Sequence, residues 1–270
     1  MKPQKELTRD WGEQLVPNKL IPAFILQGSI SRYIWAGQFV EGKNILDIGC
    51  GSGYGTNYLK TRGARSAMGG DISPEAITYA GKRYKENNLQ YVVVDAERLP
   101  FCDNSFDVVI SFEVIEHMEQ YSNYVAECLR VLRSDGLFIC STPNAQAAGS
   151  DHGKPLAHYH HKEFVANELH DLLGQHFRNV ELLGFDPQQP YDKLVYRMAT
   201  VLQSIIFKIP KIYLLTNLVT LFVFKKYHLL KMGDAETDIE RVTMERLQPY
   251  TIRDNAPMPG DLIAIGTGKR

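Results

Sequence analysis

The sequence lacks any strong excess of charge. Its 270 residues contain 30 Lys and Arg against 31 Asp and Glu, which gives a formal net charge of −1. Proteins that bind nucleic acid through their overall charge carry a marked excess of basic residues. We therefore expect no nucleic-acid partner, and any electrostatic preference must be local.

The sequence also lacks an apolar run long enough to cross a bilayer. The stretch 201–224 is strongly apolar, but Lys208, Pro210 and Lys211 interrupt it. The uninterrupted run 212–224 is shorter than the roughly 20 residues that a membrane-spanning helix needs. The first ten residues are polar and lack the apolar core of a signal peptide. These absences predict a protein that is neither secreted nor held by a transmembrane helix.

Cysteine is sparse and forms no recognisable pair. The four cysteines are widely spaced, and none belongs to a CxxC motif. Three of them lie in or beside apolar runs, which favours buried and reduced thiols. This pattern is typical of a cytosolic protein, so we expect a cytoplasmic location. The four residues are Cys50, Cys102, Cys128 and Cys140.

Apolar runs bounded by turn residues alternate with helical patterns over most of the chain. The alternation predicts an α/β fold with a Rossmann-like, doubly wound sheet of seven mostly parallel strands, covered on both faces. Strands are expected at 44–48, 66–71, 91–94, 107–112, 136–141, 180–183 and 262–265, and helices at 55–62, 74–87, 121–132 and 161–176.

Two segments depart from this alternation. Residues 1–43 contain three prolines and are expected to form N-terminal lid helices over a binding site. Residues 191–232 are largely apolar and carry seven Lys or Arg against one acid, so we expect a helical insertion before the last strand. The core then comprises 44–190 and 233–270.

The apolar, basic insertion at 191–232 has two interpretations. It can lie on an anionic membrane surface or clasp a greasy substrate, which implies peripheral contact at the inner face of the membrane. It can instead pack its apolar face on the sheet or on a second copy of the chain. Both interpretations stay open, and the sequence does not set the oligomeric state.

Residues 44–55 combine a strand with glycines at alternate positions. Gly49, Gly51 and Gly53 would let the backbone turn sharply and approach a ligand closely. The amides at the start of the next helix favour a negative group. The dinucleotide pattern GxGxxG fails because no glycine stands at its third position. The loop therefore predicts a nucleotide-like ligand other than a dinucleotide.

Three predicted strands end with or carry an acid. Asp47 would repel a pyrophosphate but could accept hydrogen bonds from an amino group, which indicates a ligand that is cationic at that end. Asp71 is positioned to accept both hydroxyls of a ribose. Asp95 suits the exocyclic amine of adenine. Singly these acids could cap helices or be solvated in loops, but together with the glycine loop they form a specific constellation.

With these motifs the sequence resembles the class I S-adenosylmethionine-dependent methyltransferases, from about residue 45 to 143. The stretches that carry the resemblance are LDIGCGSG at 46–53, GDIS at 70–73, VDAERLPFCDNSFDVVIS at 94–111 and EVIEHM at 113–118. In addition, WGEQLVP at 11–17 with SRY at 31–33 resembles a bacterial branch of methyltransferases type 11 associated with sugars, cell-surface glycans and natural products.

The resemblance implies that the cofactor is S-adenosylmethionine, and it implies which residues hold each part. The implied contacts are Asp47, Gly49, Gly51 and Gly53 for the methionine part, Asp71, Ile72, Asp95 and Ala96 for the ribose and adenine, Ser111 and Glu113 for the pocket wall, and Tyr33 from the N-terminal segment.

Methyl transfer from a sulfonium is an in-line displacement, so the protein mainly aligns the acceptor and excludes water. A hydroxyl or ammonium acceptor must also lose a proton, for which a histidine is the natural base. His117 follows the fourth predicted strand, and its rival His161 belongs to the histidine cluster of 158–161. We expect one of these two to take the proton, although His117 is as well explained by a structural role.

No metal site is expected. The spacing of Asp151 and the histidines of 158–161 matches no familiar zinc pattern. Glu113 and Glu116 alternate with apolar residues and suit a loop and a helix start better than a magnesium pair.

The sequence thus predicts a methyltransferase that acts on an oxygen or nitrogen of a small-molecule, glycan or lipid-linked acceptor. An alternative is a repurposed fold that binds S-adenosylmethionine but promotes another reaction, such as a cyclisation, or acts as a non-catalytic partner. An oxidoreductase of the NAD type is disfavoured by Asp47 and by the missing third glycine. The identity of the acceptor does not follow from the sequence, because a fold does not specify chemistry.

Overall fold

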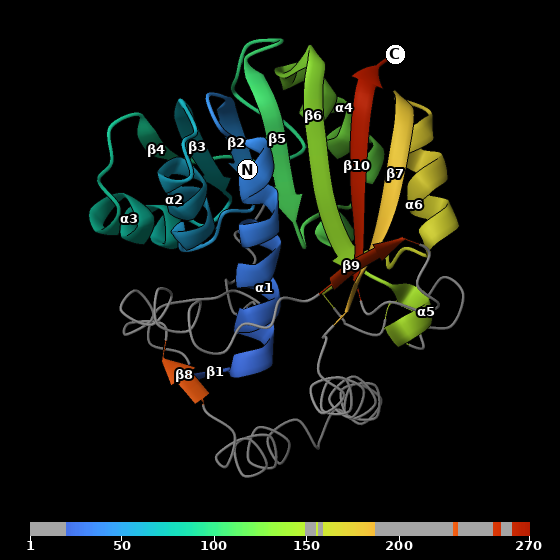
Figure 1. Cartoon of the computed structure of the whole chain (residues 1–270), viewed down its shortest axis with the longest axis horizontal. Helices are drawn as coiled ribbons and strands as arrows, with labels where there is room; N and C mark the ends of the chain where they lie inside the picture. Colours follow the sequence, from blue (N-terminus) through green and yellow to red (C-terminus); the bar gives the residue numbers. More distant parts are fainter. Residues whose placement is uncertain (1–19, 149–154, 156–158, 187–228, 232–250, 255–260) are drawn as a thin grey trace, which may run out of the picture.

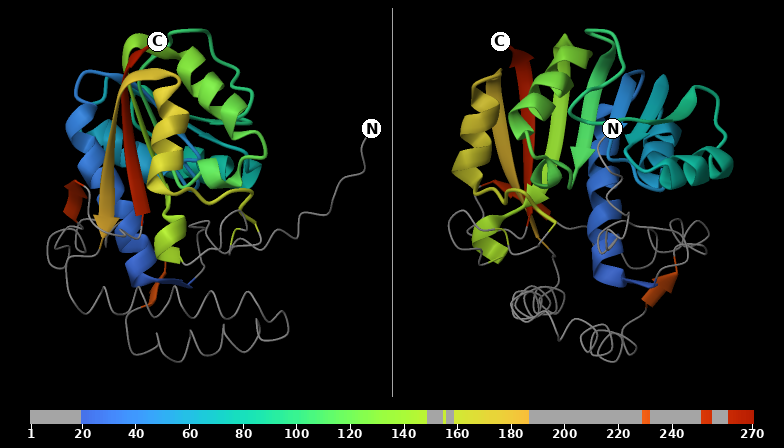
Figure 2. Two further views of the ribbon diagram at one scale, coloured as in Figure 1. Left: turned by 90° about the vertical axis from the view of Figure 1, so that its right-hand side faces the viewer. Right: turned by 180° about the vertical axis from the view of Figure 1, so that it is seen from behind.

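The computed structural model describes residues 20–148, 155, 159–186, 229–231, 251–254 and 261–270. Eight of the described strands form one sheet in the order β4-β3-β2-β5-β6-β10-β7-β9. Helices cover both faces of this sheet (Figures 1 and 2). The predicted Rossmann-like α/β fold is confirmed.

All seven expected strands form, and a short strand β9 pairs antiparallel with β7 at the edge of the sheet. Turn residues between the strands mark where each strand begins and ends, so the sequence predicts most strand ends to within a few residues. The strands β6, β7 and β10 are longer than predicted. The strands are β2 Asn44–Ile48, β3 Ser66–Asp71, β4 Leu89–Val93, β5 Phe106–Phe112, β6 Leu132–Pro143, β7 Phe177–Asp186, β9 Thr251–Asp254 and β10 Asp261–Lys269.

The order of the strands creates a crevice at the centre of the sheet. β2 pairs in parallel with β3 on one side and with β5 on the other, and β10 is antiparallel to both of its neighbours, β6 and β7. The chain first builds outward through β3 and β4 and then returns to β5. Ligands of open α/β sheets bind at such a reversal, outside the carboxyl ends of the strands.

The helices begin and end where the local sequence provides caps and turns. Ser73, for example, accepts a hydrogen bond from the Ala76 amide at 3.1 Å and Pro74 follows it, as the sequence predicted for this helix start. The helices are α1 Ala23–Ala36, α2 Tyr54–Thr61, α3 Pro74–Arg83, α4 Tyr121–Val131, α5 Ala145–Ala148 and α6 Ala166–Gly174, with the 3-10 helices η1 Gly37–Phe39 and η2 Ile115–His117.

Alternate residues of the strands fill two cores, one on each face. In β5, Val109 packs in the core that α4 and α6 cover, while Val108 and Ile110 pack in the core under α1 and α2. Because β5 is apolar on both faces, it behaves as a strand buried between two helical layers. This burial places its carboxyl end, where Glu113 follows, in the middle of the molecule.

The predicted helix at 161–176 is wrong in its first part. The amides of His161 and Lys162 donate to the Glu116 carbonyl oxygen at 2.7 and 3.2 Å, and Asn144 and Phe164 form a parallel bridge. These hydrogen bonds hold the segment before α6 in an extended course. α6 therefore starts at Ala166, five residues after His161.

A separate two-stranded sheet joins β1 Leu20–Pro22 to β8 Leu229–Lys231 in antiparallel pairing. It connects the start of α1 with the end of the predicted insertion, which is extended at this point. Residues 1–19 and 187–228 lie outside the described residues, so the helical lid and the helical insertion stay predictions, as do the boundaries 1–43 and 191–232.

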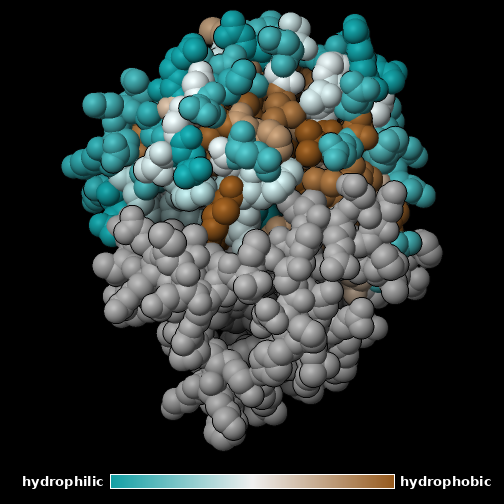
Figure 3. Space-filling view, in the orientation of Figure 1, coloured by the Kyte–Doolittle hydropathy of each residue, from teal (hydrophilic) through white to brown (hydrophobic). Residues whose placement is uncertain are grey.

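Among the described residues, no helix is both long and apolar enough to pass through a membrane. Apolar side chains gather on the face seen in Figure 3, with hydrophilic ones above them and at their sides. Three of the four cysteines are buried and all four are unpaired, as expected; Cys102 is exposed.

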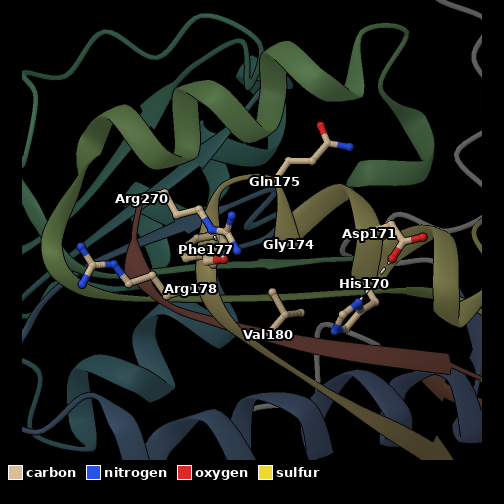
Figure 4. Close-up of a pocket in the computed structure, with 8 residues that line it drawn as sticks. All are labelled: His170, Asp171, Gly174, Gln175, Phe177, Arg178, Val180 and Arg270. Atoms are coloured by element: carbon tan, nitrogen blue, oxygen red, sulfur yellow. Dashed lines mark hydrogen bonds and ion pairs between the residues drawn. The ribbon is translucent and has the colours of Figure 1, made fainter.

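An open hollow lies at the far end of the sheet (Figure 4). His170 and Asp171 of α6 line one side, and Phe177 at the start of β7 and the C-terminal Arg270 line another. The parallel strands begin at this edge, whereas ligands of open α/β sheets bind at the opposite edge. The hollow is therefore distinct from the candidate site.

Candidate active site

The glycine loop leaves β2 and enters α2 through three residues with positive φ. Gly49, Gly51 and Gly53 have φ values of 75, 53 and 82°, a region that costs other residues about 1 kcal/mol or more. The Gly49 amide donates to the Gly70 carbonyl oxygen at 2.7 Å, which ties the loop to β3. The loop thus has the sharp turn that the sequence predicted.

Tyr91 supports the loop from two strands away, a role that the sequence did not reveal. Its hydroxyl donates to the Gly53 carbonyl oxygen at 2.8 Å. A Cβ added to Gly53 would lie 2.6 Å from the Tyr91 ring and from the Ala80 side chain. Glycine is therefore required at position 53 by its neighbours as well as by its backbone angle.

Asp47 lies beneath the loop with no exposed surface. Its carboxylate accepts a hydrogen bond from the Thr56 hydroxyl at 2.6 Å and from the Tyr33 hydroxyl at 3.2 Å. Burial raises the pKa of Asp47 to about 7, although these two hydrogen bonds act in the opposite direction. The carboxylate joins β2 to α1 and α2, and its contact with the amino group of a ligand stays a prediction.

Tyr33 is buried between the N-terminal helix and the loop. A Cβ at Gly55 would lie 2.1 Å from the Tyr33 ring, so the ring packs directly on the backbone at the start of α2. The ring also meets those of Tyr54 and Phe112 edge-on. In the described structure Tyr33 supports the loop, and its predicted contact with a cofactor is untested.

Asp71 stands beside the loop at the end of β3. Its carboxylate accepts hydrogen bonds from the amides of Gly51 at 2.8 Å and Ser73 at 2.9 Å. Burial raises its pKa above the ordinary value, and backbone hydrogen bonds act against that shift. Next to it, the side chain of Ile72 is 63% exposed, which is unusual for a large apolar residue.

The end of β4 carries the next part of the candidate site. Val93 is 47% exposed, and Ile72 and Val93 are the two large apolar side chains that are exposed among the described residues. Asp95 is exposed and accepts from the Glu97 amide at 2.9 Å, and Ala96 is half-buried. The structure thus brings Asp71, Ile72 and the Asp95 region to adjacent strand ends, as predicted from the sequence.

The wall beyond β5 contains a buried ion cluster. Ser111 is buried, and its hydroxyl donates to the Ile48 carbonyl oxygen at 3.2 Å. Glu113 has a φ of 57° and accepts from the Ser141 hydroxyl at 2.6 Å. Arg32 of α1 lies 3.4 Å from Glu113 and 2.6 Å from Asp261 at the start of β10. Burial raises the pKa of Glu113 well above its ordinary value, while Arg32 acts to lower it.

The two candidate bases are in different environments. His117 ends η2, and its Nδ1 lies 3.3 Å from the Tyr159 carbonyl oxygen. His161 has a 42% exposed side chain whose Nε2 is 3.8 Å from a Glu119 oxygen. The structure therefore does not pair the two; His117 instead meets His160, with ring centroids 4.9 Å apart.

A second buried group lies beside His117. The Thr142 hydroxyl donates to Glu116 at 3.1 Å, and the Nδ1 of His160 lies 3.0 Å from Glu163. The sequence pointed to histidines 158–161 as a cluster, but it could not show that Glu163 would become the buried partner of His160 or that Glu116 would lie near them. That contact depends on the extended course before α6.

Comparisons with known proteins find methyltransferases. The sequence profile described as a methyltransferase domain matches residues 46–140. A protein of Mycolicibacterium smegmatis that is named a probable S-adenosylmethionine-dependent methyltransferase is 36% identical over 132 residues, 49% of this chain and 50% of that protein. The phthiotriol/phenolphthiotriol dimycocerosates methyltransferase of Mycobacterium leprae is 41% identical over 99 residues, 36% of each chain. The match thus spans half the length of these relatives or less.

A solved structure shares the fold over nearly the whole length of both chains. An S-adenosylmethionine-dependent methyltransferase of Thermotoga maritima superposes with a TM-score of 0.55 and covers 92% of this chain and 95% of its own. The sequences are 15% identical, so this likeness concerns the fold alone.

Replacing Asp47 with Asn should change how stability depends on pH. The folded-state pKa of Asp47 is about 7, against an ordinary value of 3.8. The stability that the protonated side chain contributes is therefore fully present below about pH 4 and is lost as pH rises through 7. The unfolding free energy of the native chain minus that of Asp47→Asn should fall by about 3 kcal/mol between pH 5 and pH 8. Urea unfolding at both pH values measures this, and a difference that does not vary with pH contradicts it.

Replacing Gly53 with Ala should weaken the fold and the loop together. The new Cβ would adopt a positive φ and press on Tyr91 and Ala80, so we expect a loss of about 2 kcal/mol or more of unfolding free energy. Gly81→Ala is the matched control, because a Cβ there meets nothing within 4 Å and alanine favours the helix α3. Equal stability of the two variants would show that the loop is not constrained in this way.

Proposed function

We propose that this chain is a class I S-adenosylmethionine-dependent methyltransferase that transfers a methyl group to an oxygen or nitrogen of a small-molecule, glycan or lipid-linked acceptor. The match of residues 46–140 to a methyltransferase domain supports this proposal. The observation that carries the proposal is the set of exposed groups around the glycine loop, at the carboxyl ends of β3 and β4.

The loop leaves room for a ligand at one position. A Cβ on Gly51 would meet no protein atom within 4 Å, whereas one on Gly49 would lie 2.3 Å from Val114. The open side of the loop is therefore at Gly51, next to the Asp71 carboxylate. A ligand can approach the backbone there, and the residues present fit S-adenosylmethionine.

Asp71 and Ile72 suit the nucleoside part of the cofactor. The Asp71 carboxylate accepts hydrogen bonds from backbone amides, and a carboxylate has about four lone-pair positions, so it can also accept a ribose hydroxyl. The exposed side chains of Ile72 and Val93 offer an apolar surface for the adenine ring, and Asp95 and Ala96 lie beyond them. Covering Ile72 with a ring removes apolar surface from water, which favours binding.

The cofactor supplies a methyl group on a positively charged sulfur. The residues of this chain position the acceptor, exclude water and accept its proton. The Tyr159 carbonyl oxygen can only accept a hydrogen bond, so its contact with the Nδ1 of His117 at 3.3 Å favours the tautomer that is protonated on Nδ1. His161 is the second candidate base and has the more exposed ring.

An acceptor with an apolar part has support from two observations. One relative, from Mycobacterium leprae, is a lipid methyltransferase by its name. The apolar and basic stretch 191–232, which lies outside the described residues except for β8, would suit such a substrate or an anionic membrane surface. Flotation with anionic liposomes tests the membrane contact, since a chain without this stretch should stay unbound.

Mass detection of S-adenosylhomocysteine tests the transfer reaction. Incubation of the full chain with S-adenosylmethionine and an extract of candidate acceptors should yield S-adenosylhomocysteine and a product heavier by one methylene. Binding of S-adenosylhomocysteine without any transfer would favour the repurposed fold. Failure of calorimetric titration to detect either cofactor form would refute the proposal.

Replacing Ile72 with Ala should weaken cofactor binding and leave stability nearly unchanged. Its side chain is 63% exposed, so the fold loses little, whereas the lost apolar contact with adenine should raise the Kd of S-adenosylhomocysteine about tenfold. Ile72→Met keeps the apolar surface and is the matched control. If Ile72→Ala binds as tightly as the native chain in calorimetry, adenine does not pack there.

A further inference from the structure

Three side chains with metal-binding atoms converge at the end of β5. Glu116 and His117 come from η2, and His160 comes from the extended segment before α6. One potential ligand atom of each lies within 4.8 Å of the others. Glu116 has no exposed surface and the side chains of His160 and Glu163 are 4% exposed, whereas His117 is half-buried.

Both imidazoles are oriented by acceptors on Nδ1. The Nδ1 of His117 faces the Tyr159 carbonyl oxygen at 3.3 Å, and the Nδ1 of His160 faces a Glu163 oxygen at 3.0 Å. A histidine that binds a metal commonly donates its other ring N–H to a carbonyl or carboxylate in this way. When each Nδ1 donates to its acceptor, Nε2 is the ring nitrogen that would bind a cation.

The carboxylate of Glu116 is held as well. The Thr142 hydroxyl donates to its Oε2 at 3.1 Å. Two buried carboxylates, Glu116 and Glu163, thus stand beside two imidazoles, and buried negative charge is stable when a positive charge accompanies it. A cation or protonated rings would meet this requirement.

We propose that Glu116, His117 and His160 bind a divalent first-row metal cation, with Glu163 and the Tyr159 carbonyl as supporting partners. Metal–nitrogen and metal–oxygen distances are about 2.0–2.2 Å. Ligand atoms as far as 4.8 Å apart would therefore have to move closer together on binding. Imidazole and carboxylate ligands suit Mn²⁺, Fe²⁺ and Zn²⁺, and three protein ligands leave coordination positions open.

The open positions would serve the acceptor, an inference that rests on the proposed function. The cluster follows β5 at the same edge of the sheet as the glycine loop. A cation there would hold an acceptor oxygen and lower the pKa of a bound hydroxyl, which the transfer requires. His117 would then be a ligand, and His161, whose backbone is bound to Glu116, would be the remaining candidate base.

Mn²⁺ binding to the full chain tests this proposal without an acceptor. After treatment with a chelator and dialysis, electron paramagnetic resonance titration should show one Mn²⁺ bound per chain. His160→Gln should weaken binding at least tenfold, and Glu163→Gln, which removes the supporting charge, should weaken it 10- to 100-fold. The matched control is His170→Gln, because His170 is half-exposed on α6 outside the cluster and should bind as the native chain does.

Titration of S-adenosylhomocysteine accompanies each measurement and reports folding and the cofactor site separately. If the native chain binds S-adenosylhomocysteine but takes up neither Mn²⁺ nor Zn²⁺ in stoichiometric amount, the metal site is refuted while the proposed function stands. Equal weakening by His160→Gln and His170→Gln would also refute it, because binding would then be to surface histidines. If the native chain binds Mn²⁺ but does not bind S-adenosylhomocysteine, the result counts against the proposed function alone.

Discussion

The buried carboxylate of Asp47 organises the centre of the molecule. It stands in β2, an interior strand of the sheet, with no exposed surface, and a buried charge or polar group is costly unless it is hydrogen-bonded. Thr56 of α2 and Tyr33 of α1 provide those hydrogen bonds. The glycine loop lies between these contacts, so its path follows from the need to satisfy one side chain.

The residue before Tyr33 attaches the same helix to the other half of the sheet. Arg32 lies between Asp261 of β10 and Glu113 after β5, and its guanidinium stands 5.4 Å from the Phe185 ring centroid. A buried group of charges like this is strongly destabilised when one member is removed. Two consecutive residues of α1 therefore fix the helix against the carboxyl end of β5, and α1 forms part of the wall of the site.

The histidine side of the site depends on a different constraint. The carbonyl oxygen of Glu116 accepts two amides from the segment before α6, and this keeps that segment extended. The extended course carries His160 under His117 and leaves His161 toward solvent. One backbone oxygen thus decides which histidine is enclosed and which is accessible.

The sequence by itself determined the α/β fold, the glycine loop and the acids at the ends of β3 and β4. These features are local, because strand period, turn residues and positive-φ glycines depend on neighbours in the chain. The Ser73 cap and the strand β2 were predicted to the residue for this reason. Only the tertiary structure decided the partners of Asp47, the support from Tyr91, the Arg32 ion cluster and the late start of α6. Each of these is a contact between residues far apart in the chain, and periodicity carries no information about such contacts.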